Sequence, residues 1–133
     1  MKNHLFVLPP MALVLLCACE TAEVPSVSIS QPAEGTEFLT TATIPFVFDV
    51  DNFDLDEEAI GDEPEAGHGH IHLFLDNDEL PLKTTASSTL NLDLSTLEIT
   101  PGLHTFKAVL FENDHTIITD AGSDAVELNI AAP

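Results

Sequence analysis

Residues 97–110, LEITPGLHTFKAVL, decide the fold, because they combine a turn signal with the longest alternating run in the chain. Pro101-Gly102 marks the turn, and residues 103–111 then read as one strand. Successive side chains of a strand point to opposite faces, so one row is expected in the core and the other outside. One row consists of His104, Phe106, Ala108 and Leu110, and the other consists of Thr105, Lys107, Val109 and Phe111.

The rest of the chain reads as further short strands separated by turn signals, and no segment has helical periodicity. These strands are predicted around residues 27–29, 44–50, 69–76, 80–82, 90–94, 116–119 and 126–130. About seven short strands in one domain favour an all-β fold. We expect a single immunoglobulin-like (fibronectin-type) antiparallel β-sandwich over residues 26–133.

The turn before the longest strand resembles the Leu…Pro-Gly-x-Tyr…x-Ala pattern that introduces strand F of immunoglobulin-like sandwiches. His104 occupies the position of the tyrosine in this pattern. The resemblance implies that the row of His104, Phe106, Ala108 and Leu110 faces the core and that the other row faces outward. It also implies that His104 is a structural corner residue, whose imidazole replaces the tyrosine hydroxyl in a hydrogen bond to the backbone. A ligand role for His104 is the alternative.

A second stretch, GHGHIHLFLD at residues 67–76, carries histidines at every second position. Ile71, Leu73 and Leu75 form its apolar row and are expected to face the core. His70, His72 and Phe74 are then expected on the outer face, exposed to water, because a slip of one residue would bury imidazoles and expose aliphatic side chains.

The topology brings this strand beside the strand 103–111. The two lie antiparallel in an immunoglobulin-like sandwich, so the start of one meets the end of the other and places His68 and His70 near residues 112–115. The long acidic loop 51–67 opens at the same end. The sequence therefore predicts that histidines and carboxylates converge there.

Imidazole and carboxylate donors together suit Zn²⁺, Cu²⁺ or Ni²⁺. In a straight strand, three alternate residues span about 13 Å, so only two of the three strand histidines can share an ion with His115. The candidate ligands are His70, His72 and His115, with His68 and Asp114 as auxiliaries, and the candidate cofactor is Zn or Cu(II). The alternative is that these histidines only hydrogen-bond to their neighbours.

The acidic loop also suggests a calcium site. Residues 49–65 carry carboxylates at alternate positions, which fit a hard cation, although they lack the glycine and the terminal glutamate of an EF-hand loop. A solvated acidic loop is the alternative. No Ser or Cys nucleophile is placed with a base, so we expect no enzymatic activity.

The first residues predict export. Lys2 precedes an apolar run that is short for a membrane span, and Leu16-Cys17-Ala18-Cys19 resembles the lipobox of bacterial lipoproteins. This implies a signal peptide over residues 1–18, a lipidated Cys19 and a tether over 19–25, with membrane attachment through the lipid only. Glu20 favours the outer membrane of the cell envelope; a plain secretory signal is the alternative.

The charge limits the partners. The chain has 23 acidic residues and a formal net charge of −20, and the only basic side chains after the leader are Lys83 and Lys107. This excludes nucleic acid and favours cations or basic proteins, although an acidic surface also serves solubility in salt water. Neither cysteine is available for a disulfide in the domain, which we expect to be a monomer.

Several of these residues resemble one bacterial envelope family, a domain of unknown function. Its members carry Gly-His-His-His-Leu-Leu-Ile-Asp and, later, Pro-Gly-Lys-His-Thr-Leu, which match residues 69–76 and 101–106 here, and His115 follows. This chain has Ile71 in place of the middle histidine and an additional His68. The resemblance implies a fold and a set of positions, not a reaction.

These observations predict a lipid-anchored, non-catalytic binding module of the cell envelope that holds a divalent transition metal. The alternative is a structural or adhesive surface domain that binds a protein or a glycan without metal.

Overall fold

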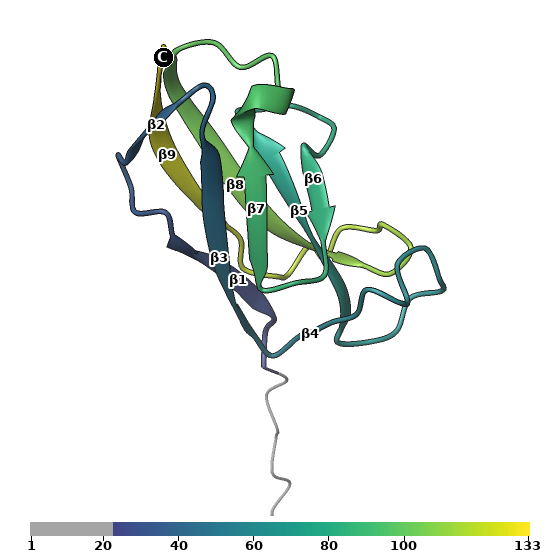
Figure 1. The fold of residues 1–133 in the computed structure, drawn as a ribbon. Helices are drawn as coiled ribbons and strands as arrows, with labels where there is room; N and C mark the ends of the chain where they lie inside the picture. Colours follow the sequence, from purple (N-terminus) through teal and green to yellow (C-terminus); the bar gives the residue numbers. More distant parts are fainter. Residues whose placement is uncertain (1–22) are drawn as a thin grey trace, which may run out of the picture.

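The computed structural model describes residues 23–133, which form a β-sandwich and so confirm the predicted fold class. The elements are β1 (Ser26–Gln31), β2 (Glu37–Leu39), β3 (Thr43–Asp51), β4 (Asp54–Leu55), β5 (His68–Leu75), β6 (Lys83–Thr85), β7 (Thr89–Asp93), the 3₁₀ turn η1 (Leu94–Thr96), β8 (Gly102–Glu112) and β9 (Asp124–Ala131). Figure 1 shows their arrangement.

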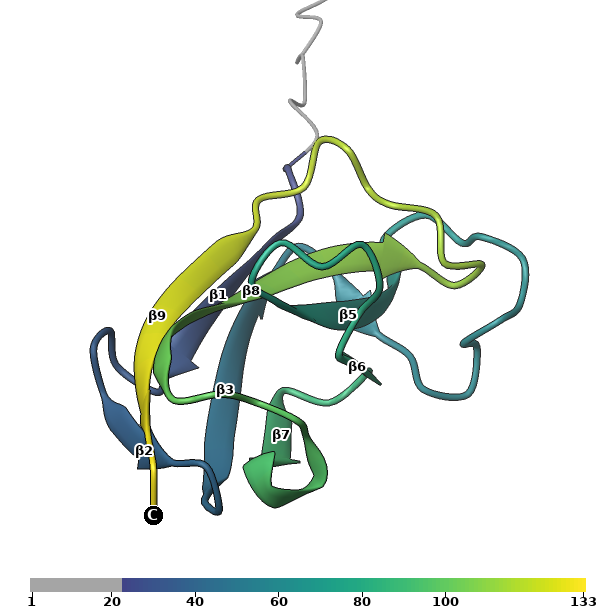
Figure 2. The ribbon, with the colours of Figure 1, turned by 90° about the horizontal axis from the view of Figure 1, so that it is seen from above.

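Two sheets make up the sandwich. One has the strand order β1-β3-β7, and the other has the order β2-β9-β8-β5-β4, with β6 paired to β5. Seen from above, the two sheets form two layers, with β8 and β5 in the larger one (Figure 2). Both of the stretches that dominate the sequence therefore lie side by side in one sheet.

The core follows the predicted alternation. In β8, Phe106, Ala108 and Leu110 are fully buried, and in β5 Ile71 and Leu73 are fully buried. These rows face Phe46 and Phe48 of β3, whose rings stack with their centroids 6.0 Å apart. Burying an aliphatic or aromatic side chain of this size stabilises the fold by about 1.5–3 kcal/mol.

Three local predictions were wrong. The segment 80–82 is not a strand, since the pairing with β5 begins at Lys83, and residues 116–119 contribute only a single bridge, between Ile117 and Phe111. The acidic loop is also shorter than predicted, because β3 continues to Asp51 and β4 pairs in parallel with the start of β5. In the acidic segment, backbone pairing with a neighbouring strand outweighs the polar character of Asp51 and Asp54.

His104 is the third residue of β8 and lies next to the turn at Pro101-Gly102. Its Nε2 is 2.7 Å from the carbonyl oxygen of Thr100, and its Nδ1 is 3.0 Å from Oδ2 of Asp76. The other oxygen of Asp76 accepts the backbone N–H of Thr105 at 3.0 Å. Burial lowers the pKa of His104, but the hydrogen bonds to Asp76 and Thr100 and the Asp76 charge outweigh it, so its pKa is raised.

The predicted signal peptide, Cys19 and residues 20–22 of the tether lie outside the described residues and stay predictions. Among residues 23–133, no helix is long and apolar enough to cross a membrane.

The corner generates a test. His104→Phe leaves the Thr100 carbonyl and the Asp76 carboxylate without the imidazole, so we expect a loss of about 1–3 kcal/mol in the free energy of unfolding. His104→Tyr supplies a hydroxyl that can donate to Thr100 and is expected to lose less. Urea titrations of the three proteins measure the difference.

The pH dependence of this effect has a defined sign. Because the folded pKa of His104 is raised, its contribution is fully present below the unfolded value of 6.5 and is lost as pH rises through the folded pKa. The gap between the parent protein and His104→Tyr should therefore shrink from pH 6 to pH 9. A gap that grows over this range would contradict the ion pair.

Candidate metal centre

The register of β5 against β8 positions the centre. Gly69 pairs with Glu112 and His70 with Phe111, so the outward row of β5 starts where β8 ends. A side chain at Gly69 would strike the carbonyl oxygen of Phe111 and the ring of Phe53, which explains why a glycine precedes His70.

His115 comes from the tight turn that follows β8. The His115 N–H donates to the Glu112 carbonyl at 3.0 Å, the Glu112 N–H donates to the Thr116 carbonyl at 2.8 Å, and Asp114 accepts the Thr116 N–H at 2.9 Å. The turn holds His115 at a φ of 66°, in the left-handed region that glycine adopts without strain. A histidine at a position suited to glycine is a local conflict between sequence and structure.

Three imidazole nitrogens meet at this point. His70 Nε2 lies 2.9 Å from His72 Nε2 and 3.0 Å from His115 Nδ1, and His72 Nε2 lies 3.1 Å from His115 Nδ1. They are the only group of three or more His, Cys, Asp or Glu donors within residues 23–133 that is close enough to share one metal ion. We refer to His70, His72 and His115 as the histidine triangle.

The exposure of the strand histidines differs from the prediction. They lie on the outer face of the sheet, opposite Ile71 and Leu73, but His70 is 0% exposed and His72 is 5% exposed. The Phe111 ring stacks on the His72 ring with centroids 3.9 Å apart, and His115 covers both strand histidines. Alternation fixes the face of a sheet, whereas exposure depends on what folds over that face.

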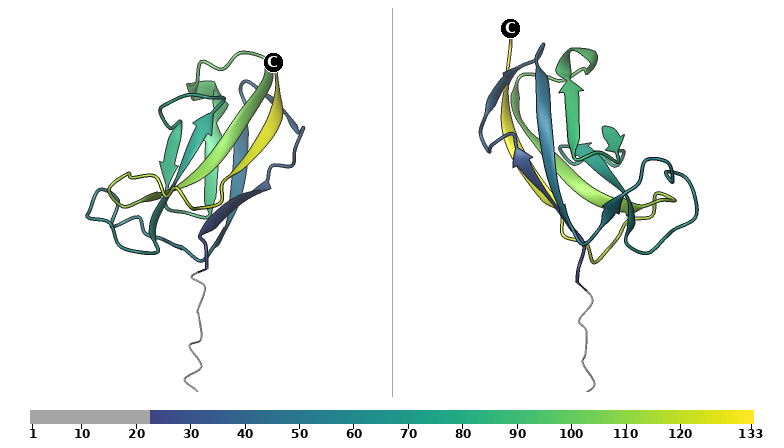
Figure 3. Two further views of the ribbon diagram at one scale, coloured as in Figure 1. Left: turned by 180° about the vertical axis from the view of Figure 1, so that it is seen from behind. Right: turned by 60° about the horizontal axis from the view of Figure 1, so that its bottom comes forward.

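Two loops meet at the end of the sandwich that carries His115. The loop between β4 and β5 and the loop between β8 and β9 lie side by side at one end of the sandwich (Figure 3). Asn113, only 2% exposed, joins them: its carbonyl accepts the Gly61 N–H at 2.7 Å, and its side-chain amide reaches the Glu63 carbonyl at 3.5 Å. This role could not be predicted from the sequence, because an asparagine in a turn is normally exposed.

Burial keeps the two strand histidines neutral. Desolvation, followed by the proximity of His115, lowers the pKa of His70 to about 4. Desolvation, followed by the proximity of His70 and His115, lowers the pKa of His72 to about 4. Neutral imidazole is the form that binds a metal ion, so these ligands are available well below neutral pH.

The second ring nitrogens of the two strand histidines have no hydrogen-bond partner among the described residues. Nδ1 of His70 and Nδ1 of His72 are buried, and no atom of residues 23–133 lies within hydrogen-bonding distance of them. Histidines that bind metals usually donate this N–H to a carboxylate or carbonyl, which tightens the site by about 10–100-fold. The described residues therefore supply three metal ligands, but they supply no hydrogen-bond partner for the second ring nitrogen of His70 or of His72.

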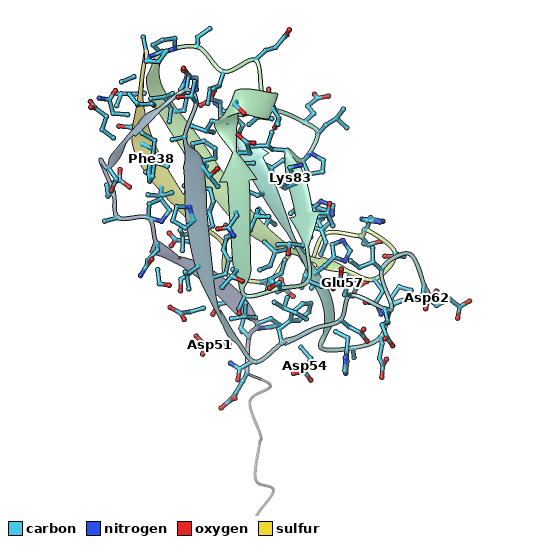
Figure 4. All side chains as sticks on the ribbon, viewed as in Figure 1. Phe38, Asp51, Asp54, Glu57, Asp62 and Lys83 are labelled. Atoms are coloured by element: carbon cyan, nitrogen blue, oxygen red, sulfur yellow. The ribbon has the colours of Figure 1, made fainter. Side chains whose placement is uncertain are left out.

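The other predicted residues lie outside the histidine triangle. His68 has its Nε2 3.9 Å from Glu65, and Asp114 is exposed with its carboxylate used by its own turn. The carboxylates of the acidic loop do not gather with one another: Asp56 accepts the N–H groups of Glu58 and Ala59. Figure 4 shows Asp54, Glu57 and Asp62 spread along this segment.

A hollow of about 280 Å³ adjoins the triangle on the same face of the sheet. Phe74, Val109 and Phe111 line it together with Ile117, and Lys107, Asp76 and Asp78 stand at its edge. Phe111 forms the wall between the hollow and His72, so the hollow is not the space enclosed by the triangle.

Comparison with known proteins identifies the fold only. No family model matches the chain, and no curated protein matches it. Fibronectin(III)-like modules of CbhA from Clostridium thermocellum superpose with a TM-score of 0.52 at 8% identity, covering 80% of this chain and 96% of that one. The endo-β-1,4-mannanase from Thermotoga petrophila gives a TM-score of 0.50 at 14% identity, covering 86% of this chain and 21% of that one.

These likenesses support an immunoglobulin-like sandwich of the fibronectin type. This chain spans about a fifth of the mannanase chain. The resemblance to the envelope family of unknown function remains a prediction.

The lowered pKa values predict a pH dependence for the ion-free protein. Between pH 6.5 and about 4 the unfolded chain protonates His70 and His72 while the folded protein does not, so stability falls as pH falls through this window. Each histidine contributes a slope of up to about 1.4 kcal/mol per pH unit.

His72→Phe provides the matched variant, because its ring can still stack on Phe111 but cannot titrate. Urea unfolding from pH 7.5 to pH 4.5, with a chelator present, should show a smaller loss of stability in His72→Phe than in the parent protein. Equal losses would show that His72 titrates alike in the folded and unfolded states.

Proposed function

We propose that this chain is a non-catalytic binding module of the bacterial cell envelope, and that it binds one divalent transition metal ion. The ligands are Nε2 of His70, Nε2 of His72 and Nδ1 of His115. A lipid on Cys19 would anchor the module, and the ion would be Zn²⁺ or Cu²⁺. Thiol and thioether ligands are absent from residues 23–133, and imidazole donors suit these two ions.

The observation that carries the proposal is the mutual distance of the three nitrogens. A ring nitrogen bears either a hydrogen or a lone pair. Among three nitrogens, at least two are therefore of the same kind, so one pair at about 3 Å must oppose two hydrogens or two lone pairs. Hydrogen bonds cannot satisfy the triangle in any protonation state.

A cation removes this conflict. All three nitrogens can then direct a lone pair at one ion, and two metal–nitrogen bonds of about 2.0–2.1 Å span up to about 4.2 Å. The observed separations of 2.9, 3.0 and 3.1 Å fall within this span. Burial adds to the argument, since the neutral state of His70 and His72 is the binding state.

The backbone of His115 supports the same function. Holding a residue other than glycine in the left-handed region costs about 1–2 kcal/mol, and such strain tends to occur at functional sites. At a purely structural turn, glycine or asparagine would serve better. A ligand role accounts for the imidazole at this position.

Metal titration of the full chain, purified without a histidine tag, tests the proposal. We expect one Cu²⁺ or Zn²⁺ per chain with a dissociation constant of about micromolar or lower. At an ion concentration 100 times that constant, the unfolding free energy should rise by about 2.7 kcal/mol. His70→Ala and His115→Ala should each weaken binding by more than about a hundredfold. This exceeds the loss of about 10–100-fold expected when a residue that only hydrogen-bonds to a metal ligand is removed.

His68→Ala is the matched control, because His68 lies on the same strand outside the triangle; it should bind as the parent protein does. If the parent binds no ion, or if His115→Ala binds as tightly as His68→Ala, the triangle is not a metal site. The structural or adhesive domain without metal would then be the better hypothesis.

His115→Gly separates a ligand role from a structural role. Glycine relieves the backbone strain, so the ion-free variant should be as stable as the parent protein or more stable by up to about 1 kcal/mol. Ion binding should nevertheless be lost. If His115 serves the fold instead, the same substitution will destabilise the ion-free protein in a urea titration.

A further inference from the structure

The histidine triangle leaves part of the coordination sphere open. We propose that an ion held there takes its remaining ligand from outside the protein, and that this ligand is a small anion. The inference rests on the proposed metal binding and adds the chemical class of the second ligand.

The described residues supply only three donors. His68 points its Nε2 toward Glu65, 3.9 Å away, and Asp114 accepts the Thr116 N–H at 2.9 Å within its own turn. No other His, Cys, Asp or Glu among residues 23–133 joins the group. Zn²⁺ is typically four-coordinate, and an ion with three protein ligands keeps a position for water or substrate.

The separations of the nitrogens show that the three donors share one side of the ion. With bonds of about 2.0–2.1 Å, nitrogens about 3 Å apart subtend about 90–100° at the ion, close to one face of an octahedron. An ion bound to all three nitrogens would therefore have its protein ligands on one side. Among residues 23–133, no other His, Cys, Asp or Glu lies close enough to bind it from the other side.

The three donors differ in exposure. His70 is 0% and His72 is 5% exposed, whereas His115 is exposed at the turn after β8. His115 therefore marks the side from which a molecule outside the protein would reach an ion held by the triangle. Phe111 closes the other side by its stack on His72.

At short range the charge of the ion favours an anion. Three neutral imidazoles would leave its two positive charges uncompensated, beside the Phe111 ring that stacks on His72. The net charge of −20 repels anions at longer range, but it is spread over the whole chain and is screened by salt. Interactions between charges strengthen as water is excluded, so an anionic donor gains more than a neutral one. The step is a ligand substitution: the lone pair of the anion replaces that of a water molecule, and the ion keeps its oxidation state.

Azide is a suitable probe of the open side. The full chain loaded with one Cu²⁺ is titrated with azide and followed by electron paramagnetic resonance and by the azide-to-copper charge-transfer absorption. We expect a saturable change in the copper hyperfine splitting, with the ion retained. His68→Ala and Asp114→Asn should give the same spectra as the parent protein before and after azide.

Other outcomes overturn the inference in distinct ways. Retained copper with no response to azide would show a closed site. A spectrum altered in His68→Ala before azide is added would show that His68 is the fourth ligand. In Asp114→Asn the amide oxygen can still accept the Thr116 N–H, so an altered spectrum there would show that the Asp114 carboxylate is the fourth ligand. An azide response that appears only in Glu65→Gln would show that a carboxylate of the acidic loop occupies the position.

The two proposals fail differently. If copper binds with equal strength to the parent protein and to His70→Ala, the metal centre itself is wrong, and the azide titration has no site to report on. If copper binding depends on His70 and His115 but azide has no effect, the centre stands and the open position does not.

Discussion

The antiparallel pairing of β5 with β8 is the constraint on which the rest of the structure depends. It runs from Gly69 opposite Glu112 to Leu75 opposite Phe106, and it orients both strands at once. One row of each strand seals the core, and the other row forms the outer face that carries His70, His72 and Phe111. Because the side-chain period is two, the core and the histidine triangle cannot be shifted independently.

The two faces of this sheet obey different physical rules. On the inner face, the buried side chains of the core are all apolar, so their packing stabilises the fold without a buried polar group. On the outer face, three imidazole nitrogens approach one another, and His115 has a strained backbone. Nδ1 of His70 and Nδ1 of His72 are also buried there without a hydrogen-bond partner among residues 23–133. Such local conflicts are expected where function rather than stability selects the residues.

Much of the fold could be predicted from the sequence, because alternation reports directly on a half-buried sheet. The inward row of β5 follows from alternation alone, whereas the inward row of β8 and the corner position of His104 follow from the resemblance of residues 97–110 to the strand F pattern. The burial of His70 and His72 could not be predicted, because it depends on contacts with Phe111 and His115, which belong to another strand and to the turn after it. Spacing puts His70, His72 and His115 first, with His68 and Asp114 as auxiliaries, and the structure brings only the first three together.

The path of the chain gives the domain a direction. Pro25 accepts the Gly122 N–H at 2.9 Å, and Ser26 forms a bridge with the same glycine, so the chain enters the sandwich beside the β8–β9 connection. β9 ends near Gly102, at the far end of β8. If Cys19 carries the proposed lipid, the bilayer lies within about 25 Å of this entry point, the greatest length of seven extended residues. A carrier that delivers or collects an ion would then reach the histidine triangle through the space between the domain and the lipid headgroups.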